Sequence, residues 1–280
     1  MYKDQIGTRM KTYYEEISKT RLMRRTPVAI RIDGRSFHTW TRGFQKPFDS
    51  ILMTSMQETM KYLCENIQNC VFGYSQSDEI TLILIDYQKL TSSAWFDYEV
   101  QKVCSIAASM ATMAFNKFFI KNVNYFKMTH KKDNTVNTYC ITLAYAIEKG
   151  AMFDARCFNI PKEEVANLIY WRQLDAKRNS IQMVGHANFS HKELQNKSCE
   201  DIKNMLLAQK YINWDSLSED HKWGAACIKI LPKEEVVEIP TALGKSVRMV
   251  INHSSWFIDK HMPILKENWD YINRYIYVGE

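Results

Sequence analysis

The sequence predicts an α+β fold with a split β-α-β-β-α-β (ferredoxin-like) core, additional packed helices and a smaller C-terminal α+β part. Three observations predict this fold. Runs with the length of strands occur at 28–33, 71–75, 80–85 and 152–159. Two stretches between these runs, 49–66 and 98–119, repeat apolar residues at helical spacing. With 280 residues and 46% apolar content, the chain can bury a core of this size.

The N-terminal segment is predicted to be an amphipathic helix over residues 4–25. Its apolar residues recur near helical spacing between charged ones: Ile6, Met10, Tyr13, Tyr14, Ile17 and Leu22. We expect this helix to end before Pro27 and its apolar stripe to face the core.

A single carboxylate, Asp33, stands at the exit of the first strand, where Gly34 breaks the apolar run. The backbone amides of residues 34–38 lie just past this strand, where a turn exposes several N–H groups that can cradle a triphosphate. A helix capped by Asp49 or Ser50 follows, and its Met-rich face is expected to join the core.

The runs at 71–75 and 80–85 predict a hairpin whose polar connection is Gln76-Ser77-Asp78-Glu79. A hairpin tip beside a strand exit can bring Asp33 and Asp78 together. Two neighbouring carboxylates repel unless a cation lies between them, and oxygen ligands without Cys or His favour Mg²⁺. This arrangement suits phosphoryl or nucleotidyl transfer with two metals. On pattern alone, the alternative of an ordinary Asx turn and a Ser-Asp-Glu turn stays open.

The rest of the chain is predicted to alternate helices and strands. Residues 121–138 are polar and basic and are expected to form a mobile loop. A helix is expected over 161–179, with acidic residues in its first turn and basic ones in its last. Strand-like AACIKIL and VRMVIN precede a final helix near 263–275. No Gly or Pro marks a linker, so a catalytic domain over 1–160 and a C-terminal region over 161–280 should pack together.

Composition limits the possible partners and compartment. The net charge of +6 includes basic clusters at Arg21, Arg24 and Arg25, at 130–132 and at 177–178, as in a protein that binds a polyanion. Any single cluster can equally be a solvated face.

The seven cysteines form no CxxC pair, so neither a disulfide framework nor a zinc ribbon is indicated. Without a membrane-length apolar run or an apolar signal region, we expect a cytoplasmic protein with no membrane partner.

Five motifs in order resemble one known family: RIDGRSFH, GFQKP, VFGYSQSDE, FDARCFNIP and WRQLDAKRNS. They are similar to those of the tRNA-His guanylyltransferases and their relatives, the Thg1-like 3′-to-5′ RNA polymerases. The predicted element order also matches the palm of ordinary polymerases and nucleotidyl cyclases, so we expect a palm-like catalytic core.

The resemblance implies two Mg²⁺ ions held by Asp33, the Gly34 main-chain carbonyl and Asp78, with Glu79 as a supporting catalytic carboxylate. It also implies ATP and GTP or another NTP as substrates, tRNA as partner and a homotetramer. The implied nucleotide-binding residues are Asp33, Gly34, Arg35, Ser36, Phe37, His38, Lys46, Ser77 and Asp78. The candidate tRNA-binding residues, which carry cationic, aromatic or amide groups, are Lys102, Arg156, Trp171, Arg172, Lys177, Arg178 and Asn179.

The activity expected from the resemblance is addition of nucleotides to the 5′ end of a tRNA in the 3′-to-5′ direction. Eukaryotic members carry His-Ile-Asn-Asn-Leu-Tyr-Asn after the Trp-Arg-Gln helix, whereas residues 177–183 here read KRNSIQM. Glu99 also departs from eukaryotic members, which have a basic residue near this place. KRNSIQM is similar to the Thg1-like branch, so we expect template-directed repair of 5′-shortened tRNA. The alternatives are a guanylyltransferase proper, which adds a G before the first nucleotide, a nucleotide cyclase, and a tRNA-binding module with an inactive site.

Overall fold

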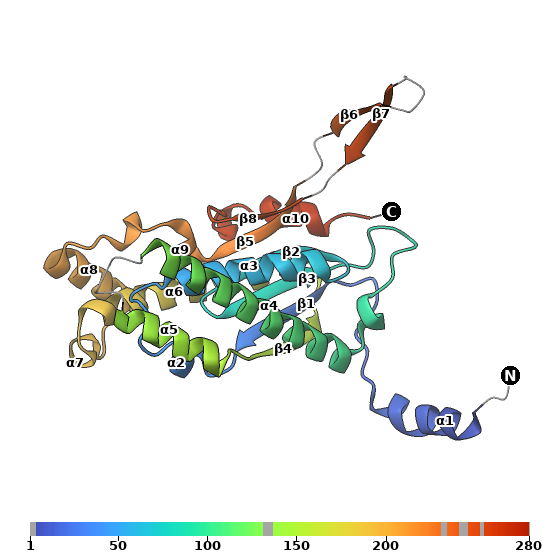
Figure 1. Cartoon of the computed structure of the whole chain (residues 1–280), viewed down its shortest axis with the longest axis horizontal. Helices are drawn as coiled ribbons and strands as arrows, with labels where there is room; N and C mark the ends of the chain where they lie inside the picture. Colours follow the sequence, from blue (N-terminus) through green and yellow to red (C-terminus); the bar gives the residue numbers. More distant parts are fainter. Residues whose placement is uncertain (1–3, 131–136, 231–233, 241–245, 253–254, 280) are drawn as a thin grey trace.

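A computed structural model describes residues 4–130, 137–230, 234–240, 246–252 and 255–279 (Figure 1). The strands in these ranges are β1 (Val28–Gly34), β2 (Cys70–Gln76), β3 (Glu79–Leu84), β4 (Phe153–Asn159), β5 (Ala225–Ile230), β6 (Glu234–Pro240), β7 (Ser246–Asn252) and β8 (Ser255–Asp259). The α-helices are α1 (Gln5–Met10), α2 (Phe37–Trp40), α3 (Ser50–Asn66), α4 (Val100–Thr129), α5 (Asn137–Lys149), α6 (Lys162–Asn188), α7 (His191–Leu194), α8 (Cys199–Lys210), α9 (Glu219–Trp223) and α10 (Asp270–Ile276).

Six strands form one antiparallel sheet in the order β4-β1-β3-β2-β5-β8. The elements β1, α3, β2, β3, α4 and β4 follow the predicted β-α-β-β-α-β order, with α5 as an addition before β4. The predicted hairpin is present, because only Ser77 and Asp78 join β2 to β3. Strands β5 and β8 extend the same sheet beyond β2, past the boundary expected at residue 160. Strands β6 and β7 pair separately and stand away from this sheet in Figure 1.

The two faces of the sheet bury different side chains, because neighbouring residues of a strand point to opposite faces. Val28, Ile30 and Ile32 of β1 pack in the core that α3 and α4 cover. Ala29 packs in the core on the other face, where residues of α6 and α10 lie. The same alternation puts Asp33 on the α6 face, at the end of β1.

Helix α4 is a core helix of this fold. Within the described ranges it is the one helix whose length and mean hydropathy of 1.4 would allow it to cross a membrane. Seven of its residues are buried, and six of them, among them Phe115 and Phe119, belong to the core between the sheet and helices α3 and α4. The apolar character of α4 is therefore used in packing α3 and the sheet.

The prediction of an N-terminal core helix over 4–25 is wrong. Helix α1 and two further helical turns end at Ser18, and none of their residues is buried. Ile6, Tyr14 and Ile17 are 66%, 65% and 76% exposed. We call residues 5–18 the N-terminal arm, which projects from the body in Figure 1.

Residues 20–25 leave the helix because groups elsewhere in the chain bind them. The Leu22 N–H donates to the Tyr98 carbonyl (3.0 Å), and Leu22 packs against the core. The fully buried Asp86 accepts hydrogen bonds from the Arg24 guanidinium (2.7 Å) and the Arg25 main chain (2.8 Å). These partners outweigh the local helical pattern.

Two further boundaries differ from the expected ones. Helix α4 continues to Thr129 and α5 begins at Asn137, so most of the loop expected over 121–138 is helical or lies outside the described residues. Helix α6 continues nine residues past 179, to Asn188, because Ile181 and Val184 extend its buried stripe into a third core with α7 and α8.

Candidate active site

The end of β1 and the tip of the β2–β3 hairpin lie side by side. Asp33 is in register with Glu79, and the Gly34 N–H donates to the Asp78 carbonyl (3.1 Å). Ser77 has a φ of +50°, the left-handed region that tight hairpin turns use. Its hydroxyl donates to the Asp78 carboxylate (3.0 Å). These bonds hold Asp78 next to the strand end that carries Asp33.

The two aspartates interact electrostatically. Burial raises the pKa of the Asp78 carboxyl above its ordinary value, and the negative charge of Asp33 raises it further. The ion pairs of this region among the described residues are made by Glu79, not by Asp33 or Asp78. An oxygen-only pair of like-charged ligands fits a hard divalent cation.

This donor set is small, which suits Mg²⁺. Within the described ranges, no group of three or more His, Cys, Asp and Glu residues could hold a metal ion. Asp33, Asp78 and the Gly34 carbonyl would therefore leave the other coordination positions to water and substrate phosphate, as Mg²⁺ sites commonly do.

Glu79 is engaged by two arginines. Its carboxylate is buried, accepts a hydrogen bond from Arg172 Nε (2.8 Å) and lies 3.9 Å from Arg31 Nε. Burial raises the pKa of Glu79, and the two guanidinium groups oppose that shift. Arg172, a candidate tRNA-binding residue, is therefore placed inside the protein against Glu79 and not at the surface.

Phe37 anchors the loop that follows β1. Its ring is buried and lies 5.1 Å from the rings of both Trp40 and Phe153. A Cβ added to Gly34 would come within 2.3 Å of Phe37 Cδ2, so the ring lies directly on the glycine. The structure places the Phe37 side chain in the core, and the loop around it is held in place.

The polar residues of this loop face solvent. Arg35, Ser36 and His38 are exposed, and Ser36 has a φ of +54°. The amides expected to cradle a triphosphate are partly used, since Gly34 donates to Asp78 and Arg35 donates to the Met152 carbonyl (2.9 Å). The amides of residues 36–38 lie at the start of α2, where a helix leaves its first N–H groups without intrahelical partners.

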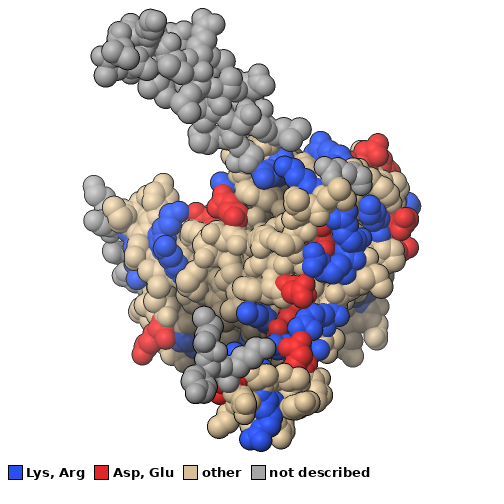
Figure 2. Space-filling model, turned by 90° about the vertical axis from the view of Figure 1, so that its right-hand side faces the viewer, with Lys and Arg blue, Asp and Glu red and all other residues tan. Residues whose placement is uncertain are grey.

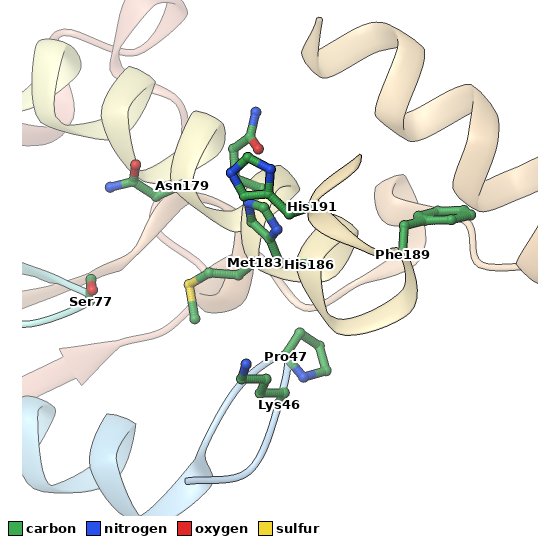
Figure 3. A pocket seen from close by; sticks show the side chains of 9 residues that line it. Lys46, Pro47, Ser77, Asn179, Met183, His186, Phe189 and His191 are labelled. Atoms are coloured by element: carbon green, nitrogen blue, oxygen red, sulfur yellow. The ribbon is translucent and has the colours of Figure 1, made fainter. Parts of the chain in front are cut away.

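A pocket of about 620 Å³ opens beside the hairpin tip (Figure 3). Lys46 and Pro47 form one side of it, and the C-terminal half of α6 forms the other. It brings together two predicted nucleotide-binding residues, Lys46 and Ser77, with Asn179. Its lining contains no acidic residue and comprises Lys46, Pro47, Ser77, Asn179, Gln182, Met183, His186, Phe189 and His191. These groups suit an anionic ligand with an apolar or planar part.

The far wall of this pocket lies beyond the end of the helix predicted over 161–179. The rings of His186 and His191 lie 6.2 Å apart there, and Gln182 and Met183 complete it. A helix that ends at residue 179 does not bring these residues to the pocket, so they are not among the predicted site residues. The available signal was the helical spacing of Ile181 and Val184 beyond that point.

The candidate tRNA-binding residues on α6 differ in their exposure and in their contacts within the chain. Trp171 is half exposed and has the Arg172 guanidinium 4.3 Å from its ring, so it is not a buried anchor. Arg178 is exposed and paired with Asp175, and Lys177 lies 5.4 Å from the Trp223 ring.

Lys102 and Arg156 are exposed on other elements. Lys102 lies over the Phe96 ring (4.9 Å) near the start of α4. Arg156, on β4, pairs with Asp154 (3.2 Å). Asp154 is in register with Asp33 and is a further carboxylate, which is not among the predicted site residues.

The basic cluster at 21–25 is engaged within the chain. Arg21 pairs with Glu16 (2.5 Å), and Arg24 pairs with Asp86 (2.7 Å) and Asp97 (3.1 Å). Figure 2 looks onto this end of the molecule, where basic and acidic residues are interspersed. The cluster at 130–132 lies partly outside the described residues.

Comparisons with known proteins match this fold. The family model described as tRNAHis guanylyltransferase matches residues 7–161. The structure of a bacterial tRNA(His) guanylyltransferase (Thg1)-like protein in complex with ATP is 35% identical, with a TM-score of 0.76, over 98% of this chain and all of that one. A bacterial protein of the same description in complex with GTP gives a TM-score of 0.70 at 35% identity and the same coverage. A probable tRNA(His) guanylyltransferase of Dictyostelium discoideum is 26% identical over 83% of this chain and 86% of its own length.

The fold, the carboxylate pair and these matches define the class of the protein as a nucleotidyltransferase. Within that class, the chain belongs to the tRNAHis guanylyltransferase family. The family predicted from the five motifs is confirmed, and so is the α+β fold class.

Proposed function

We propose that this nucleotidyltransferase adds nucleotides to the 5′ end of tRNA in the 3′-to-5′ direction. The observation that carries the proposal is the placement of Asp33 and Asp78 at one point, beside a pocket without acidic residues. The bacterial relatives in complex with ATP and with GTP support a nucleotide as the ligand.

In this proposal Asp33, Asp78 and the Gly34 carbonyl hold two Mg²⁺ ions. When bound, the metals would activate the attacking oxygen of each step and stabilise the negative charge on its leaving group. Two hydrogen bonds keep Asp78 next to the strand end that carries Asp33: the Gly34 N–H donates to the Asp78 carbonyl, and the Ser77 hydroxyl donates to the Asp78 carboxylate.

The pocket takes the nucleotide. Lys46 supplies a positive charge for phosphate, and Met183 and Phe189 offer apolar surface to the base. Asn179 and Gln182 can hydrogen-bond polar edges. Asn179, Gln182 and Met183 all belong to the segment 177–183 that distinguishes the two branches of the family, which supports a difference between them in how the incoming nucleotide is held.

The reaction has two steps. The 5′-monophosphate of the tRNA first attacks the α-phosphate of ATP or GTP and releases pyrophosphate. The 3′-hydroxyl of an incoming NTP then attacks the activated 5′ phosphate, forms the new phosphodiester and releases AMP or GMP. Arg156 and Lys102 are exposed and suited to hold 5′ phosphates, Arg156 through the fork of its guanidinium. Pairing with the opposite strand of the acceptor stem selects the NTP, so the protein needs to recognise pair geometry and not one base.

The experiment that tests this function compares two substrates. With Mg²⁺, ATP and labelled NTPs, a tRNA lacking its first 5′ nucleotide should be extended more efficiently than full-length tRNA-His. The ratio of kcat/KM should be at least about ten, because pairing that contributes about 1.4 kcal/mol to positioning gives that factor. Changing the opposing base should change the NTP that is added.

Preference for full-length tRNA-His, with G added whatever the opposing base, would instead establish a guanylyltransferase proper. Cyclic nucleotide formed from an NTP without RNA would identify a cyclase.

Binding of tRNA should weaken steeply with salt, because phosphate contacts release counterions. Replacing Lys177 and Arg178 together with Ala should lower the slope of log affinity against log salt by about one to two, one for each phosphate contact. Fluorescence anisotropy over a salt series measures this slope, with Lys61→Ala on the outer face of α3 as a one-charge control. A slope equal to that of the wild type would assign both side chains to intramolecular contacts.

The N-terminal arm supports the expected homotetramer. A helical segment this short is marginally stable without packing, and none of the arm's residues is buried within the chain. Its apolar side chains are therefore suited to pack against another copy.

A further inference from the structure

Arg172 lies between the catalytic hairpin and helix α6. Its Nε donates to Glu79 Oε1 (2.8 Å), and its Nη2 donates to Asp175 Oδ2 (2.6 Å). Only 6% of the residue is exposed. Binding of RNA by this guanidinium would require breaking two charged hydrogen bonds in a desolvated place, which is costly.

Glu79 depends on this partner. It is 7% exposed, follows Asp78 directly in the chain and lies in register with Asp33, whose charge repels it. Arg31 is also near, but its Nε lies 3.9 Å away and has no hydrogen-bond partner. Among the described residues, Arg172 is therefore the cation that is hydrogen-bonded to Glu79.

The same network reaches the pocket. Asp175, the second partner of Arg172, also accepts hydrogen bonds from Arg178 and from the Asn179 side chain. Asn179 and Ser77 both line the pocket, one from α6 and the other from the hairpin. The Arg172 guanidinium thus ties the hairpin to the pocket wall.

We propose that Arg172 is a positioning residue, which holds Glu79 and thereby keeps Asp78 beside Asp33 in the geometry that binds metal. This inference rests on the proposed two-metal function. Without Arg172, Glu79 would be a buried carboxylate without its hydrogen-bonded cation, next to another carboxylate. Movement of Glu79 away from Asp33 would relieve this electrostatic repulsion. Because Asp78 is the preceding residue in the chain, Asp78 would be displaced as well.

The test measures Mn²⁺ binding by electron paramagnetic resonance, with Mn²⁺ as the probe for the Mg²⁺ site, and needs neither tRNA nor NTP. Arg172→Ala should weaken Mn²⁺ affinity roughly 10- to 100-fold, the usual effect of removing a residue that supports metal ligands. The kcat of nucleotide addition should fall by a similar factor, while tRNA affinity and its salt slope stay at the wild-type values. Arg172→Lys, which keeps the charge but cannot bridge both carboxylates, should lie in between and provides a second variant if Arg172→Ala does not fold.

The matched control is Arg24→Ala, which removes another arginine from a buried carboxylate, Asp86, near the opposite end of β3. It should lower the melting temperature without changing Mn²⁺ affinity. Folded Arg172 variants with wild-type Mn²⁺ affinity and weaker tRNA binding would overturn the inference and make Arg172 an RNA contact. Wild-type protein that binds Mn²⁺ but extends no tRNA would count against the proposed function alone, and wild-type protein that binds no Mn²⁺ would overturn both.

Discussion

Asp33→Asn and Asp78→Asn are each expected to abolish nucleotide addition while the fold is retained. A ligand shared by two metals contributes several kcal/mol of transition-state stabilisation. Because about 1.4 kcal/mol corresponds to a tenfold change in rate, turnover should fall at least about 100-fold. Asn keeps the shape of Asp and removes the repulsion that raises the pKa of Asp78, so the melting temperature should stay the same or rise slightly. Single-turnover addition of a labelled NTP, together with thermal unfolding, measures both effects.

Mg²⁺ gives a second measurement on the same variants. It should raise the melting temperature of the wild type, because a ligand that binds the folded state stabilises it, and should not do so for either variant. Asp215→Asn, which alters a carboxylate paired with Lys203 at the surface, is the control and should behave as the wild type. Near-normal turnover in Asp78→Asn would reject the metal assignment and favour a tRNA-binding module with an inactive site.

Gly34→Ala is expected to have the second large effect. The added Cβ would lie 2.3 Å from Phe37 Cδ2, and the Phe37 ring cannot yield because Trp40, Phe115 and Phe153 surround it. Overpacking of this kind costs about 1–3 kcal/mol of unfolding free energy. The loop must therefore shift, and it carries Asp33 on one side and the exposed Arg35, Ser36 and His38 on the other. Because these groups belong to the site, kcat should fall by a larger factor than the lost unfolding free energy alone would cause.

Urea unfolding and turnover of Gly34→Ala separate these two effects. Gly7→Ala is the control, because the added Cβ meets only the exposed Asp4 carboxylate that caps α1, so its effect is confined to the exposed arm. If Gly34→Ala kept both the wild-type midpoint and turnover, the loop would have to be more adaptable than its aromatic packing indicates.

The central fold was predictable because its signals are local. The alternation in β1, the helical spacing in α3 and the polar connection Gln76-Ser77-Asp78-Glu79 each fix an element within a few residues. The meeting of Asp33 and Asp78 then follows from which strand ends are neighbours in the sheet.

The remaining features depend on partners far away in the chain. Residues 4–25 have an amphipathic pattern, which predicts one helix. Nothing within these residues indicates that Asp86 and the main chain at Tyr98 bind residues 22–25, which are therefore not helical. Arg172 looked like an RNA contact because its residue type suits phosphate, and its pairing with Glu79 arises only when α6 lies across the sheet. His186 and His191 come together only because α7 folds back beside the end of α6.

The addition of β5 and β8 to the edge of the sheet formed by the first four strands bears on how this protein can be divided. The family match ends at residue 161, but the sheet does not end there, since β2 has β5 as its outer neighbour and β5 in turn has β8. A polypeptide that stopped near residue 160 would leave the main-chain groups of β2 unpaired along one side and would uncover Phe72 and Tyr74, which are now fully buried. Such an open edge invites pairing between molecules. The stretch that the family model matches is therefore not expected to fold on its own, and β5 and β8 are as much a part of the sheet as the strands that bear its carboxylates.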